Sequence, residues 1–97
     1  MHKNAQFIRA HTMLPPDAHI IIEDIALGDH VKVCVEIYNH TEKFWAYVRH
    51  IDGNEITCQV DQDMRLSRCH GLFDKSMFII DRYLILGVIS NANEQNI

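Results

Sequence analysis

The stretch that decides the fold runs from Lys43 to Val60. It begins with KFWAYVRHI at residues 43–51, continues with DGN at 52–54 and ends with EITCQV at 55–60. Both outer runs are rich in aromatic and β-branched residues, which favour strands. Gly53 tolerates the positive φ that a tight hairpin turn requires. The stretch therefore predicts a β-hairpin that turns at Gly53.

An unbroken register across this hairpin predicts which side chains share a face. A two-residue turn at residues 52–53 or at residues 53–54 gives the same result, because side chains alternate with a period of two. In this register the core is formed by the face that holds the apolar residues of 55–60. It holds Trp45, Tyr47, Arg49, Ile51, Ile56, Cys58 and Val60.

A second strand precedes the hairpin. Apolar and other residues alternate from Val31 to Tyr38, after a predicted turn at Gly28-Asp29. Residues 39–42 read as the loop into the Trp45 strand, so the two strands should be sheet neighbours. A four-residue loop would place position 30 opposite position 51, and His30 near His50.

The rest of the chain adds further short strands. Residues 77–80 and 84–89 read as the last two strands, and residues 61–70 as a long connection with room for one helical turn. We divide the chain into an N-terminal arm (1–16), a β domain (17–89) and a disordered polar tail (90–97). Residues 17–27 fit a helix or an extended segment, and three consecutive isoleucines favour the latter.

The expected fold is a small, mostly β single domain, with an α+β arrangement as the other option. Four to six short strands suit an SH3-like barrel or a half-open antiparallel roll.

Composition narrows the function classes. The 97 residues carry 9 Lys and Arg against 13 Asp and Glu, a formal charge of -4, whereas nucleic-acid and anionic-membrane binders usually show a basic footprint. No apolar run reaches the length of a membrane span, and the first residues lack the apolar core of a secretory signal. We expect a cytoplasmic protein with no membrane partner and with nucleic acid as a disfavoured one.

Several motifs together resemble a known family. They are Gly28-Asp29-x-Val31-Lys32-Val33, residues 42–48, residues 51–57, residues 60–63 and His70-Gly71-Leu72. In this order and spacing they are similar to the small bacterial and phage domains grouped as domain of unknown function 2314 (YegJ-like). The resemblance covers roughly residues 28 to 86. It implies a compact, mostly β domain and brings no established activity.

Seven histidines are the compositional oddity of the chain. If His30 and His50 are neighbours, they could bind a divalent metal, with Asp29 or Asp52 as a third ligand. The competing interpretation is two solvated loop histidines, since the chain has no tight metal-ligand spacing. We expect no bound cofactor.

The three cysteines show no Cys-x-x-Cys pair, which argues against a zinc site or a disulfide framework. Cys69-His70 raises the hypothesis of a nucleophile with its base. The alternative is a structural turn at Gly71 that places Leu72 in the core. Cys34 and Cys58 lie in predicted strands, where a thiol behaves as a small apolar group.

Trp45, Tyr47 and Arg49 are the candidate binding residues. Aromatic side chains on small β-barrels often recognise peptides or bases, but the hairpin register favours the core for Trp45 and Tyr47. We expect a binding or accessory module without catalytic machinery, with a protein partner or a second copy of the chain. The alternatives are a metal- or thiol-dependent enzyme using His30, His50 or Cys69, and a single-strand nucleic-acid binder.

Overall fold

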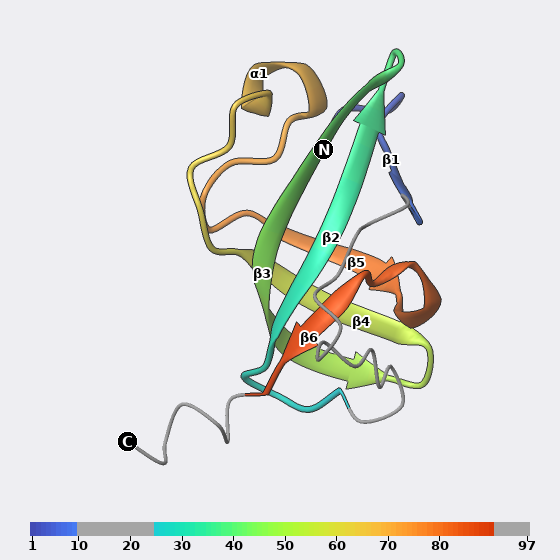
Figure 1. Ribbon diagram of the computed structural model, residues 1–97, viewed down its shortest axis with the longest axis vertical. Helices are drawn as coiled ribbons and strands as arrows, with labels where there is room; N and C mark the ends of the chain where they lie inside the picture. The colour runs from blue at the N-terminus through green and yellow to red at the C-terminus, as the bar shows by residue number, and fades with distance from the viewer. Residues whose placement is uncertain (10–24, 91–97) are drawn as a thin grey trace, which may run out of the picture.

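The computed structural model of the protein describes residues 1–9 and 25–90. In this part of the chain it contains six antiparallel strands in one curled sheet, so the expected half-open, mostly β roll is confirmed. A single-turn helix and a 3-10 helix complete it (Figure 1). In chain order the elements are β1 (Gln6–Ile8), β2 (His30–Ile37), β3 (His40–Asp52), β4 (Glu55–Val60), α1 (Ser67–His70), β5 (Met77–Asp81), the 3-10 helix η2 (Arg82–Leu84) and β6 (Gly87–Ile89).

The long strand β2 organises the sheet. Strands β2, β3, β4 and β5 pair in sequence order, and β2 carries β3 on one edge. Along its other edge lie β1, opposite Cys34–Glu36, and β6, opposite His30–Lys32. The sheet therefore curls until its last strand returns to its first long one (Figure 1). As a result, β1 and β6, which come from the two ends of the described chain, both pair with the same edge of β2.

The β2–β3 turn is tighter than the sequence suggested. Ile37 lies directly opposite His40, so Tyr38 and Asn39 alone form the turn. Both have positive φ, 48° and 67°, as a two-residue type I′ hairpin requires. The predicted four-residue loop is therefore wrong. Asn adopts this conformation readily, whereas a tyrosine there gives no sequence signal.

The second hairpin turns where it was predicted, but its faces differ. Asp52 lies opposite Glu55, as one of the two predicted turns requires. The register then shifts between Val48 and His50, because Val48 pairs with Cys58 and His50 with Thr57. Arg49 is thus an extra residue in β3, a β-bulge, and such a bulge bends and twists its strand. Compared with an unbroken register, every side chain of β3 before the bulge therefore points to the opposite face of the sheet.

This change of face overturns the prediction that Trp45 and Tyr47 are core residues. Phe44, Ala46 and Val48 are buried, whereas Trp45 and Tyr47 are half-buried on the opposite, outer face. Backbone contacts join β3 to the residues before β2: the Val48 N–H donates to the Asp29 carbonyl, and the Gly28 N–H donates to the Val48 carbonyl. The predicted turn at Gly28-Asp29, with a Gly28 φ of 84°, thereby holds β3 beside its bulge.

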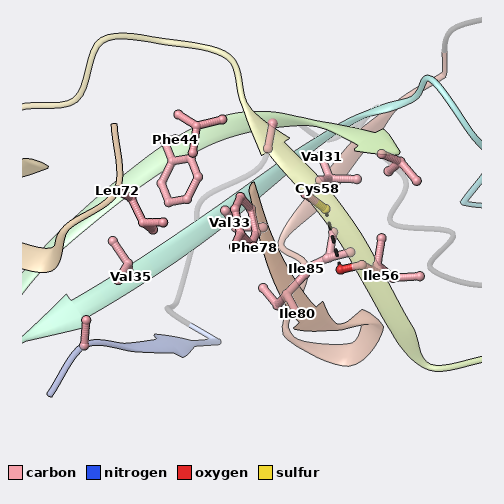
Figure 2. Close-up of a cluster of buried hydrophobic side chains, with 14 of the residues drawn as sticks. Val31, Val33, Val35, Phe44, Ile56, Cys58, Leu72, Phe78, Ile80 and Ile85 are labelled. Atoms are coloured by element: carbon pink, nitrogen blue, oxygen red, sulfur yellow. Dashed lines mark hydrogen bonds between the residues drawn. The ribbon is translucent and has the colours of Figure 1, made fainter. Parts of the chain in front are cut away.

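The core fills the inside of the roll. The core face predicted for β2 is confirmed, since Val31, Val33, Val35 and Ile37 are all buried there, but Cys34 between them is buried as well. Side chains from β3, β4 and β5 face them, together with Leu72, which is buried as expected beside Gly71 (Figure 2). The core consists mainly of Val31, Val33, Val35, Ile37, Phe44, Ala46, Val48, Ile56, Cys58, Val60, Leu72, Phe78, Ile80 and Ile85.

Aromatic rings close the open side of the roll. Phe78 on β5 contacts Phe7 on β1, with ring centroids 4.8 Å apart, and Phe44 on β3, at 5.6 Å. Of the predicted N-terminal arm the structure describes residues 1–9, which include strand β1. The expectations for residues 10–24, which include most of the extended segment predicted for residues 17–27, and for the polar tail beyond Ser90 lie outside the described residues.

The last predicted strand is shorter than expected. Residues 82–84 form η2, whose first turn is capped by the Asp81 carboxylate accepting a hydrogen bond from the Tyr83 N–H. Strand β6 starts only at Gly87. An aspartate that accepts from the amide two residues on favours such a turn over a strand.

Candidate functional site

The outer face of β2 and β3 carries the aromatic candidates. Lys32 lies opposite Trp45, and its ammonium is 5.8 Å from the centroid of the indole ring. Arg49 places its guanidinium carbon 5.1 Å from the centroid of the Tyr47 ring. Both are cation–π contacts. We call Lys32, Trp45, Tyr47 and Arg49 the aromatic–cation patch.

The patch is held in place by its neighbours. The Trp45 N–H donates to the Gln62 side chain at 2.9 Å, and the Trp45 carbonyl accepts from the Asp61 N–H at 3.0 Å. Arg49 Nε donates to the Gln59 side chain at 3.0 Å. The backbone of Trp45 and the side chain of Arg49 are thus anchored by strand β4 and the segment after it. Arg49 shares a face with Tyr47 because the two residues are two apart on the strand, and the β-bulge makes this the outer face.

His30 belongs to the edge of the patch. It lies opposite Tyr47, with ring centroids 4.0 Å apart, and its Nε2 is 3.2 Å from Asp61 Oδ2. Lys75 Nζ donates to the other oxygen of Asp61 at 3.1 Å. Burial alone would raise the pKa of Asp61, but hydrogen bonds from Lys75, His30 and Tyr47 hold it below its ordinary value. Asp61 is therefore an ionised carboxylate already surrounded by donors.

The proposed His30–His50 pair is wrong. The two-residue turn shifts the β2–β3 register, so His30 faces Tyr47, while exposed His50 lies opposite Thr57 on β4. Within residues 1–9 and 25–90, no group of three or more histidine, cysteine, aspartate or glutamate side chains could hold a metal ion. The possible third ligand Asp29 is buried and accepts a hydrogen bond from the Ala26 N–H, so it acts as a turn residue.

His70 is buried and has a partner that the sequence did not suggest. Its Nε2 is 3.0 Å from Glu42 Oε1, and its Nδ1 accepts a hydrogen bond from the Leu72 N–H. Because Nδ1 is an acceptor, Nε2 carries the proton and donates to the carboxylate. Both ring nitrogens are thus engaged, so His70 cannot serve as a base for Cys69, which is exposed on α1.

Glu42 is the centre of this buried polar cluster. Besides the bond from His70, its carboxylate accepts hydrogen bonds from the N–H groups of Arg65, at 2.6 Å, and Leu66, at 2.8 Å. Burial alone would raise the pKa of Glu42, but these hydrogen bonds outweigh it and lower the pKa below its ordinary value. The cluster attaches the segment that carries α1 to the start of β3. Its role is structural, since Glu42 and His70 are 8% and 1% exposed.

The thiols of Cys34 and Cys58 and the hollow beside α1 are weaker candidates for a functional site. Burial raises the pKa of Cys58 to about 12 and also raises that of Cys34, so neither is a thiolate near neutral pH. A shallow hollow of about 330 Å³ is lined by residues 63–69, Phe73 and Asp74. Two arginines there are balanced by two aspartates, which gives the hollow no charge preference.

Comparison of the chain with protein-family models, with curated proteins and with solved structures finds no match in any of the three. Among the described residues, no helix has the length and apolar character needed to cross a membrane.

Proposed function

We propose that this protein is a non-catalytic binding module that uses the aromatic–cation patch as its binding surface. The observation that carries the proposal is the position of Trp45. A large aromatic side chain sits half-exposed on a sheet face, beside a second aromatic residue and two cations, in a domain that has an apolar core elsewhere. Tryptophan, tyrosine and arginine are the residues enriched in binding hot spots.

The architecture is suited to this role. We propose an SH3-like barrel, because four meandering strands are followed by a 3-10 helix and by a strand that returns to the first strand of the meander. In such a small roll the inner face is filled by side chains, so ligands must use the outer face or the loops. The patch lies on paired strands, which position binding side chains more firmly than loops do.

We also propose a cytoplasmic location and keep the YegJ-like resemblance as a hypothesis. Cys34, Cys58 and Cys69 are all free thiols, as is usual in a reducing compartment. An enzymatic function lacks comparable support, because His30 is paired with Asp61, His70 with Glu42, and the buried thiols are protonated.

The patch can be tested with a reporter that the chain already contains. Trp45 is the only tryptophan, so its emission reports directly on the surface. We would titrate the protein with a panel of probes: oligo(dT), an acidic peptide, a basic peptide and a proline-rich peptide. We expect at least one probe to shift the emission, and Arg49→Gln to weaken that response.

Phe73→Ala provides a matched control, because Phe73 is a large side chain, 52% exposed, on the loop before β5. This variant should respond as the wild type does. The proposal is wrong if no probe changes the Trp45 emission, or if Arg49→Gln and Phe73→Ala have equal effects on the probe that does.

A further inference from the structure

We propose that β5 is a dimerisation edge, at which two copies of the chain pair their β5 strands in antiparallel fashion. This surface is separate from the aromatic–cation patch, so the inference does not rest on the proposed function. Its starting point is the position of β5 as the last strand of the series from β2 to β5 (Figure 1). One side of β5 pairs with β4, and among residues 1–9 and 25–90 no strand pairs with its other side.

The backbone groups along this edge point away from β4. At the two ends of β5, the Ser76 carbonyl accepts from a β4 amide and the Arg82 N–H donates to the Asn54 carbonyl, so the even-numbered residues face β4. Because the bonding direction alternates along an antiparallel strand, the N–H and C=O groups of Met77 and Ile79 point outward. No hydrogen bond joins these groups to another residue of the described chain. The edge therefore offers two donors and two acceptors in a row to a further strand.

Strand β5 is anchored from its inner side and is unprotected along its edge. Phe78 and Ile80 are buried in the core, and the Phe78 ring contacts the Phe7 ring of β1. These contacts hold the strand in place before a partner arrives, which reduces the entropy lost on binding. Residues 77–81 contain no proline and no lysine, and their pairing with β4 has no bulge, so three common devices that block edge pairing are missing here.

The side chains of this edge favour an identical strand as the partner. Met77 and Ile79 are 53% and 59% exposed on the outer face, and residues 77–80 carry no charge. Antiparallel pairing along the full five residues of β5 sets Ile79 beside Ile79 of the second copy. The two Asp81 carboxylates then stand about 13 Å apart along the strands, whereas parallel pairing would put them side by side. Antiparallel pairing therefore joins apolar side chains and separates like charges.

The small size of the interface determines how strongly the two copies associate. Met77, Ile79 and the neighbouring Tyr83, which is 49% exposed, are the large apolar side chains that pairing covers. With the backbone of β5 they amount to less than the roughly 1,600 Å² that a standard interface buries, so we expect a dissociation constant on the order of 100 µM. The contact is isologous, because the same edge is used on both copies, and association therefore stops at the dimer.

The experiment measures the mass of the protein by sedimentation equilibrium. From about 10 µM to about 1 mM the wild type should pass from monomer to dimer. Ile79→Lys should weaken this association about tenfold or more, because a lysine on an edge strand opposes pairing. Leu27→Lys is the matched control: it introduces the same charge at an apolar side chain that is 62% exposed and lies outside β5. This control should dimerise as the wild type does, and both variants should keep the wild-type far-ultraviolet circular dichroism.

A cysteine cross-link tests the antiparallel register directly. Cys34 and Cys58 are buried, so Cys69→Ser gives a background without an exposed thiol. In the expected register the two copies of residue 79 form a hydrogen-bonded pair with Cα atoms about 5.5 Å apart, a separation that a disulfide spans. Under mild oxidation, Ile79→Cys in this background should therefore form an intermolecular disulfide much faster than Leu27→Cys does.

The inference is overturned if the wild type stays monomeric at the highest concentration, or if Ile79→Lys and Leu27→Lys dimerise equally. It is also overturned if Trp45→Ala abolishes the dimer and Ile79→Lys does not, because the copies then meet through the aromatic–cation patch. An added peptide of alternating valine and threonine tests a foreign strand. If the wild type stays monomeric while this peptide slows hydrogen exchange of the Ile79 amide, the edge accepts a segment of another protein, and dimerisation is again refuted. None of these results alters the response of Trp45 to the probes, so the proposed function is tested separately.

Discussion

Removing the Glu42 carboxylate tests the buried cluster that joins β3 to the α1 segment. In Glu42→Ala, His70 Nε2 loses its acceptor at a position where the side chain is 1% exposed, and the N–H groups of Arg65 and Leu66 lose theirs. A buried donor left unpaired costs about 1–3 kcal/mol, and a hydrogen bond to a charged group contributes about 1.5–3 kcal/mol. The N–H groups of Arg65 and Leu66 lie nearer the surface, so hydrogen bonds to water offset part of the free energy that they lose.

We therefore expect Glu42→Ala to lower the free energy of unfolding by about 3–5 kcal/mol, as for breaking other buried pairs. This is a large share of the roughly 5–15 kcal/mol of an ordinary domain. The assay is urea unfolding followed by circular dichroism. Glu55→Ala is the matched control, because it removes an exposed glutamate from β4 and should change stability by about 0.5 kcal/mol or less.

The cluster also predicts a pH dependence with a definite sign. The folded-state pKa of Glu42 lies below its ordinary value of 4.5, so its contribution is fully present above pH 4.5 and is lost as the pH falls through the folded pKa. The stability difference between the wild type and Glu42→Gln should therefore shrink below pH 4.5. If Glu42→Ala and Glu55→Ala unfold within 1 kcal/mol of each other at pH 7, the cluster does not stabilise the fold and our reasoning is wrong.

Three further predictions concern the fold and the hypothesis of a metal site at His30. Phe44→Ala should lower the free energy of unfolding in urea by about 3–5 kcal/mol and Trp45→Ala should lower it clearly less, since only Phe44 is buried in the core. Equal losses would show that Trp45 is a core residue. Gly71→Ala should lower the melting temperature more than Gly53→Ala. Both glycines have positive φ, but only at Gly71 would an added Cβ meet a backbone atom, at 2.9 Å, so the reverse order would contradict this packing. Micromolar zinc should leave the melting temperature unchanged in the wild type and in His30→Ala alike, and a shift of several degrees that the substitution abolishes would establish a metal site.

The sequence by itself determined the local features of this protein. The alternation of Val31, Val33 and Val35 specified which face of β2 is buried, because a strand turns successive side chains to opposite sides. Gly53 specified the β3–β4 turn, and its φ of 60° is the conformation for which glycine was expected. Gly71 likewise ends α1 in the left-handed conformation. Each of these features depends on a few neighbouring residues, which is why the pattern alone was sufficient.

Only the tertiary structure decided the face of Trp45 and Tyr47 and the partner of His70. One extra residue in β3, the bulge at Arg49, moved both rings from the expected core to the outer face, and composition gives no sign of where a strand takes up such a residue. The Glu42–His70 contact joins residues 28 positions apart. Its existence depends on how the α1 segment folds back over β3, which no local periodicity encodes. The sequence therefore identified Trp45, Tyr47 and Arg49 as candidate binding residues, but only the strand register, which depends on long-range pairing, puts them on the outer face.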